Sequence, residues 1–251
     1  MNKVKLVVFD AKCFFAHFRK HFSTTSSLSY SFPPRTTIVG MLAAMLGYDR
    51  DAYYPIFSSE RCRVALQVKT PVRRLTHTIN YLMTDKPLTL RKLRGIENRA
   101  QVHVEMLVSD NREPRQLAYR IFFNHEDEGL LKKVAEMLQR RKFAYPPSLG
   151  KANNLAELDH VDFVDAEVSR PGGEVEVQTV VPRSVLEKVI PQPGRRIYIE
   201  ELVPADFTED RKLKRIESYI YEGEGKPIKV VVNCEVFNCT LDGDEVAGVF
   251  M

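Results

Sequence analysis

The pattern of apolar and polar positions predicts that the chain opens with a strand followed by a helix. Residues 4–8 carry apolar side chains at every second position, which is typical of a strand with a buried face. A stretch rich in Ser and Thr follows, and then apolar residues recur at helical spacing up to Gly47, which can end the helix. Thr36 or Thr37 can cap its start.

The remainder of the first 145 residues continues with strands and a second, amphipathic helix. The apolar spacing predicts strands at residues 61–72, 101–108 and 117–123, and a helix at residues 130–138. With a further strand after them, the order of elements is βαββαβ, in which helices cover one face of a sheet. RRM-type RNA-binding modules share this topology. We therefore predict an α+β protein with a ferredoxin-like (RRM-like) βαββαβ domain.

A basic segment separates two of the predicted strands. The stretch from Arg73 to Arg99 contains seven basic residues and two acidic ones. A strand, a basic excursion and a returning strand together describe a β-hairpin, at about residues 73–100, that projects from the domain as a thumb.

Charge divides the chain into a basic first part and an acidic last part. Residues 1–104 contain 17 Lys and Arg against 6 Asp and Glu, whereas residues 152–251 contain 11 against 20. This asymmetry indicates a polyanionic partner for the basic part, with chance clustering of solvated charges as the alternative. The last hundred residues are also rich in strand patterns. We therefore expect a first domain at residues 1–155, which includes the thumb, and a β-rich C-terminal region at residues 156–251.

The composition excludes several classes of protein. The 251 residues are 44% hydrophobic and 28% charged, which is ordinary for a soluble globular chain. The longest nearly apolar run, residues 38–47, is much shorter than the roughly 20 residues that cross a bilayer. The four cysteines form no CxxC pair, and His17 and His21 have no evident third metal ligand. We expect no membrane contact, no metal and no other cofactor, and the reducing cytoplasm as the location.

Basic and aromatic residues remain as the candidate chemistry. The segment just after the first strand places four phenylalanines among basic and imidazole groups. Cationic side chains neutralise phosphates, and aromatic faces stack on unpaired bases. Phe18, Arg19 and Lys20 are therefore candidate RNA-binding residues. Phe14 and Phe15, directly after the strand, are expected in the core.

Two further groups of cations are candidates for phosphate contacts. Arg35 precedes the predicted helix, where free backbone N–H groups and the positive end of the helix dipole attract anions. The basic residues of the thumb would line the hairpin with charge, although a hairpin that only faces solvent has the same composition. These thumb candidates are Arg73, Arg74, Arg91, Arg94 and Arg99.

Two motifs give the chain a family resemblance. Residues 8–47, VFDAKCFFAHFRKHFSTTSSLSYSFPPRTTIVGMLAAMLG, resemble the N-terminal signature of the fifth family of CRISPR-associated (Cas) proteins, within the RAMP superfamily. In that family the first strand leads through a Phe-Arg-Lys segment to Pro-Pro-x-Thr-Thr and a helix. Residues 143–154, FAYPPSLGKANN, resemble the second hallmark, a Tyr-Pro-Pro-x-Leu-Gly-Lys loop. The motifs add Thr36 and Lys151 to the candidate RNA-binding residues.

The resemblance implies a structural, non-catalytic subunit of a type I CRISPR surveillance complex (Cascade), of a form most like the I-B branch. Such a subunit caps the foot of the complex and binds the 5′ handle of the crRNA, beside the backbone subunit and the large subunit. Its thumb inserts across the guide, and target DNA is met through the complex. The basic first half agrees with this implication, since phosphate contacts and base stacking hold single-stranded RNA.

Two other functions stay open. One branch of the family is a metal-independent endoribonuclease that processes pre-crRNA repeats, with a Tyr near the end of the first helix and a mid-chain Lys-His pair. Here Leu46 aligns with that Tyr, and the Lys-His dipeptide is Lys20-His21 in the N-terminal motif. His17 or His21 as the base, with Lys20 on the phosphate, would suit RNA cleavage without a metal. The other function is a protein–protein adaptor whose basic half meets an acidic partner.

Overall fold

The computed structural model describes residues 2–24, 26–82, 94 and 99–251, and it confirms the α+β class. Strands make up most of the regular structure, with α-helices in the minority. The candidate residue Arg91 lies outside the described residues.

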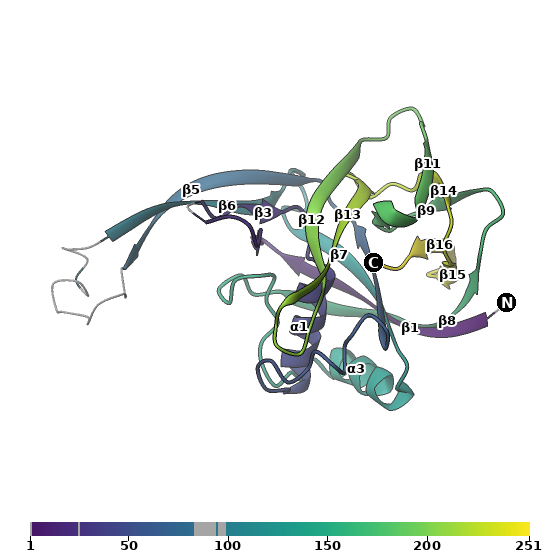
Figure 1. Ribbon diagram of the computed structural model, residues 1–251, viewed down its shortest axis with the longest axis horizontal. Coiled ribbons are helices and arrows are strands. Elements are labelled where there is room, and N and C mark those ends of the chain that lie inside the picture. Colours follow the sequence, from purple (N-terminus) through teal and green to yellow (C-terminus); the bar gives the residue numbers. More distant parts are fainter. Residues whose placement is uncertain (1, 25, 83–93, 95–98) are drawn as a thin grey trace.

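An antiparallel sheet of six strands forms the centre of the molecule, with the strand order β16-β15-β8-β1-β7-β4 (Figure 1). Its strands are β1 (Asn2–Cys13), β4 (Cys62–Val68), β7 (Leu117–His125), β8 (Glu157–Ser169), β15 (Val236–Leu241) and β16 (Asp244–Val249). Strand β8 pairs with β1 over nearly its whole length. Strands from both sides of residue 155 therefore share this sheet, and the division of the chain at that residue stays a prediction.

Two helices lie on the same side of this sheet, α1 (Arg35–Leu46) and α3 (Glu128–Arg140) (Figure 1). As predicted, Gly47 ends α1, and it does so in the left-handed conformation with a φ of 85°. The predicted capping by Thr36 or Thr37 is wrong, because the N-cap residue is Pro34 and no side chain caps the helix. Pro33 and Pro34, which directly precede α1, and the burial of the helix define where α1 starts.

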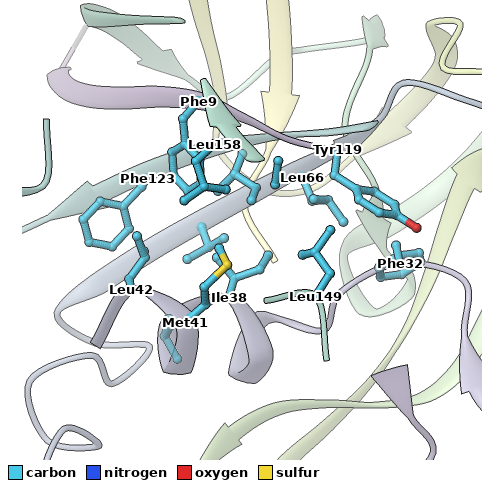
Figure 2. Packing of buried hydrophobic residues seen from close by; sticks show 14 of the residues in the cluster. Phe9, Phe32, Ile38, Met41, Leu42, Leu66, Tyr119, Phe123, Leu149 and Leu158 are labelled. Atoms are coloured by element: carbon cyan, nitrogen blue, oxygen red, sulfur yellow. The ribbon is translucent and has the colours of Figure 1, made fainter. Parts of the chain in front are cut away.

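The main core lies between the helices and one face of the sheet. Successive residues of a strand point to opposite faces, so Val7 and Phe9 of β1 pack in the core with the helices, while Leu6 and Val8 join a second cluster. Figure 2 shows the side chains of the sheet meeting those of α1. Each large side chain buried here contributes about 1.5–3 kcal/mol to the free energy of folding.

Most of the remaining C-terminal strands form two small antiparallel sheets, with the orders β10-β13-β12 and β11-β14-β9. The strands are β9 (Glu174–Val177), β10 (Val181–Pro182), β11 (Leu186–Ile190), β12 (Ile197–Phe207), β13 (Leu213–Glu222) and β14 (Ile228–Val232), with a 3-10 turn η1 (Arg183–Val185). Strand β12 packs against α1. The C-terminal strands thus return to the helix that the N-terminal motif forms.

A long hairpin stands at the place predicted for the thumb. Its arms are β5 (Val72–Leu82) and β6 (Arg99–Ser109), and they project from the body of the protein (Figure 1). The segment after β1, with its short strands β2 (Phe18–Arg19) and β3 (Ser29–Tyr30), lies along β6. The bridges Ala16–Leu107 and Ser27–Val104 join the two. The N-terminal motif therefore supports the base of the hairpin.

A buried ion pair joins α1 to β12. The Arg35 side chain is 1% exposed, and its guanidinium lies 3.5 Å from the carboxylate of Asp206, which is also buried. The guanidinium also donates to the backbone carbonyls of Phe57 and Cys62, both at 2.9 Å. Asp206 in turn accepts from the hydroxyl of Ser59 at 2.7 Å. The predicted role of Arg35 as a phosphate seat is therefore wrong, since solvent and ligands do not reach it.

Replacing Arg35 by the uncharged and similarly long methionine should strongly destabilise the protein. The change leaves Asp206 buried without its cation, and breaking a buried pair in this way typically costs about 3–5 kcal/mol. We expect a clearly lower urea midpoint for Arg35→Met. Lys5→Ala, which removes an exposed pair with Glu128, is the control and should leave the midpoint unchanged. Equal midpoints for the two variants would contradict the structural role given to Arg35.

Candidate nucleic-acid interface

A cleft of about 460 Å³ opens beside the hairpin. The segment after β1, the first turn of α1, the loop around Gly150 and both arms of the hairpin form its walls. The polar and aromatic residues that line it include Arg19, Thr24, Ser26, Thr37, Tyr81 and Lys151. Both sequence motifs therefore contribute to one cleft.

A glycine brings the two motifs into contact. Gly150 has a φ of +92°, a conformation that side chains disfavour, and a Cβ added to it would lie 1.7 Å from the carbonyl oxygen of His17. Next to it, the N–H of His17 donates to the carbonyl of Leu149 at 3.2 Å. The requirement for glycine at this position of the second motif follows from this close approach.

The contact places Lys151 in the cleft. Its Nζ donates to the hydroxyl of Tyr81 at 3.0 Å and lies 5.8 Å from the centre of that ring, which is partly exposed. Across the cleft, Arg19 is exposed and donates to the backbone carbonyl of Ser23 at 3.1 Å. The structure thus brings together two of the predicted cations, Arg19 and Lys151, with no carboxylate paired to either among the described residues.

A buried carboxylate holds two other predicted cations. Glu200 of β12 lies 2.6 Å from the Nζ of Lys20 and 3.0 Å from the guanidinium of Arg74 on β5. It also accepts from the N–H and the hydroxyl of Ser31, at 3.0 and 2.7 Å. Lys20 and Arg74 were candidates for RNA phosphates, and both lie beside this one carboxylate, which compensates one of their two positive charges. Glu200 instead anchors the base of the hairpin to β12.

The other predicted residues lie in varied surroundings. Phe18 is buried and meets Tyr119 edge to face with ring centres 6.0 Å apart, so its predicted stacking on RNA is wrong. Thr36 is half-buried and donates to the carbonyl of Pro204 at 3.5 Å. Arg73 is exposed and lies 3.5 Å from the carboxylate of Asp110.

Two remaining candidates, Arg94 and Arg99, are exposed at the far end of the hairpin. Phe14 and Phe15 are 60% and 50% exposed, so the expectation that they belong to the core is wrong. They follow the last buried residues of β1, where the chain leaves the sheet.

The two histidines of the N-terminal motif differ in burial and in their hydrogen-bond partners. His17 is buried, with Nδ1 2.6 Å from the carbonyl oxygen of Glu105 and Nε2 2.9 Å from the hydroxyl of Ser27. Burial lowers the pKa of His17 below its ordinary value of 6.5, against the opposing hydrogen bond to Glu105. His21 is exposed, and its Nδ1 lies 3.0 Å from the hydroxyl of Tyr30.

Several lining residues have no counterpart in the sequence predictions. Tyr81, Thr24, Ser26 and Thr37 all face the cleft. Tyr81 is the next-to-last residue of β5 and lies within the basic segment, so an aromatic residue among those cations was a usable signal. The small hydroxyl residues carry no such signal, because only the fold brings them to the cleft.

Two further classes of site were searched among the described residues. In that part of the chain, no group of three or more His, Cys, Asp or Glu side chains is arranged to hold a metal ion. None of the described helices is both long and apolar enough to span a membrane.

Comparison with known proteins gives the class of this chain. The family model described as CRISPR-associated protein (Cas_Cas5) matches residues 7–214, which is most of the sequence. The chain therefore belongs to this family of CRISPR-associated proteins, in agreement with the resemblance carried by its two motifs. No curated protein matches the sequence.

One solved structure shows the same fold, and a second is reported beside it. A crystal structure of a CRISPR protein from Archaeoglobus fulgidus has 15% sequence identity and a TM-score of 0.56, with 97% of this chain and 98% of that chain covered. A chain of a CRISPR RNA-guided surveillance complex has 12% identity and a TM-score of 0.47, with 96% and 91% covered.

Replacing Gly150 by alanine should disturb the contact between the motifs. The added Cβ meets backbone rather than a flexible side chain, so the loop has to move, at a cost of about 1–3 kcal/mol. We expect a lower urea midpoint for Gly150→Ala. Gly172→Ala is the matched control, since a Cβ there meets nothing within 4 Å. A Gly150→Ala midpoint equal to that of the control would contradict the close approach to His17.

Proposed function

We propose that this chain is a structural, non-catalytic subunit of a type I CRISPR surveillance complex, of I-B-like form, that binds the 5′ handle of the crRNA in the cleft beside the hairpin. One observation carries the proposal: Arg19 and Lys151, from the two family motifs, line the same cleft as the partly exposed ring of Tyr81. Membership in the CRISPR-associated family supports an RNA of the CRISPR system as the ligand.

The chemistry of the cleft suits single-stranded RNA. Arg19 and Lys151 would neutralise phosphates, and the ring of Tyr81 offers a surface on which an unpaired base stacks. The hydroxyls of Thr24 and Ser26 would donate to phosphate oxygens or accept from a 2′-OH. No part of this arrangement needs a metal ion or another cofactor.

The proposal includes a ferredoxin-like unit at the centre of the fold. Its support is the element order β1-α1-β4-β7-α3-β8 together with the strand order β8-β1-β7-β4 within the antiparallel sheet. Both helices lie on one side, as such a unit requires (Figure 1). RRM modules, which share this topology, present on their sheet aromatic side chains on which RNA bases stack.

The partners in this proposal are the crRNA, the backbone subunit and the large subunit, with target DNA met through the complex, in the cytoplasm. The projecting hairpin supports an insertion across the guide, since its arms extend beyond the body of the protein (Figure 1).

The non-catalytic assignment rests on the burial and the partners of the candidate catalytic groups His17, Lys20 and His21. Both ring nitrogens of His17 already have partners, and the ring is buried. The ammonium of Lys20 is paired with Glu200, so it does not offer its charge to a scissile phosphate. Of these three candidates, His21 has the exposed ring, and its Nδ1 lies 3.0 Å from the hydroxyl of Tyr30.

Removing both cations of the cleft should weaken RNA binding and its dependence on salt. For Arg19→Ala/Lys151→Ala we expect about tenfold weaker binding of RNA that carries the repeat-derived 5′ end, with a slope of log K against log salt reduced by about 0.7 per lost phosphate contact. Fluorescence anisotropy over a salt series measures both. Lys132→Ala/Lys133→Ala, on the exposed side of α3, makes the same charge change and should bind like wild type. An unchanged slope in the cleft variant would refute this interface.

The endoribonuclease alternative is separated by incubating the chain with repeat RNA in EDTA. We expect the RNA to remain intact, because both ring nitrogens of His17 have partners and the ammonium of Lys20 is paired with Glu200. Cleavage at one position that disappears in His21→Ala would overturn the non-catalytic assignment.

A further inference from the structure

A second cleft lies at the base of the hairpin, on the face opposite to the one that carries the first cleft. Its volume is about 270 Å³, and it is bounded by the start of β5 and by β12 and β13. Arg74 of β5 lines this cleft, whereas Tyr81 of the same strand lines the first one. Residues an odd number of positions apart on a strand point to opposite faces, which explains the division.

An exposed tyrosine forms the aromatic wall of this second cleft. The ring of Tyr198 is 48% exposed and stacks on Tyr221, with ring centres 5.7 Å apart and planes at 28°. Tyr221 is itself buried and meets Phe32 edge to face at 5.3 Å. A Cβ at Gly223 would lie 2.3 Å from the ring of Tyr198. Because Gly223 has no side chain, the ring of Tyr198 lies flat on β13. Tyr221 connects that ring to the core.

Charged groups of both signs surround this ring. Arg74 is held by Glu200 but keeps 42% of its side chain exposed, and Arg196 is 71% exposed at the rim. Two carboxylates also line the cleft, and both have cations beside them. Asp110 lies 3.5 Å from the guanidinium of Arg73, and Glu224 lies 2.5 Å from the ammonium of Lys226 and 3.6 Å from the guanidinium of Arg196. A flat aromatic surface with hydrogen-bond acceptors and cations around it suits a planar ligand that has amino groups and a nearby phosphate.

We infer that the second cleft binds a single unpaired nucleobase with an exocyclic amino group, stacked on Tyr198. The carboxylates accept from the amino group, as acidic side chains do from cytosine, and Arg196 takes the adjoining phosphate. The inference rests on the proposed function, since it takes the base from the RNA held in the first cleft.

Homopolymers test the inference without knowledge of the handle sequence. The full chain would be titrated with fluorescein-labelled A, C and U oligoribonucleotides of about 12 nucleotides, within the usual site size for single strands. Wild type should bind A and C oligomers more tightly than U. Tyr198→Ala should bind A and C about tenfold more weakly, the effect of one lost base stack, and should no longer discriminate against U.

Two control variants separate stacking from folding. Tyr198→Phe keeps the aromatic surface and should retain both affinity and preference. Ile216→Ala, an equally exposed apolar residue of β13 outside both clefts, should bind like wild type. Binding of all three oligomers by Tyr198→Ala with wild-type affinities, or with one uniform loss, would overturn this inference alone. If instead no oligomer binds wild type in a salt-dependent way, the proposed function fails as well.

Discussion

Two buried carboxylates on one strand hold the basic half of the chain in place. Glu200 of β12 pairs with Lys20 and Arg74, and Asp206 of the same strand pairs with Arg35. A buried charge without a partner is far more costly than a hydrogen-bonded pair, so these contacts fix β12 against α1 and the hairpin. The charge asymmetry of the sequence is thus satisfied in part within the molecule. Cations that no internal carboxylate pairs with among the described residues, such as Arg19 and Lys151, remain available to bind a polyanion.

This internal pairing also defines both clefts. The alternation of side chains along β5 puts Tyr81 and Arg74 on opposite faces of the hairpin, and Glu200 fixes the base of the hairpin against β12. Gly150 fixes the first cleft from the opposite side by bringing the second motif against the first. A binding surface that is held in shape before the ligand arrives loses less entropy when the ligand binds. The contacts of Glu200 and Gly150 therefore keep the clefts in a defined shape.

The sequence predicted those parts of the fold that local signals determine. Period-2 alternation in β1 and the glycine after α1 were sufficient for the first strand and helix, and the order of elements followed from their neighbours. Strand β13 has no such local signal, because its first half is charged and its pairing with β12 and β10 makes it a strand. The two motifs located the cleft. The roles of Arg35 and Lys20 were not predictable, because a basic residue in a sequence carries no sign of the distant carboxylate that buries it.

The place of β12 in the chain has a consequence for synthesis. The ribosome releases α1, the hairpin and the family motifs before it makes the strand that carries their counterions. Until then Arg35, Lys20 and Arg74 lack the carboxylates that pair with them in the finished protein. The nascent chain is therefore most attractive to nucleic acid before it is complete, and it gains selectivity only when its acidic end folds back onto it.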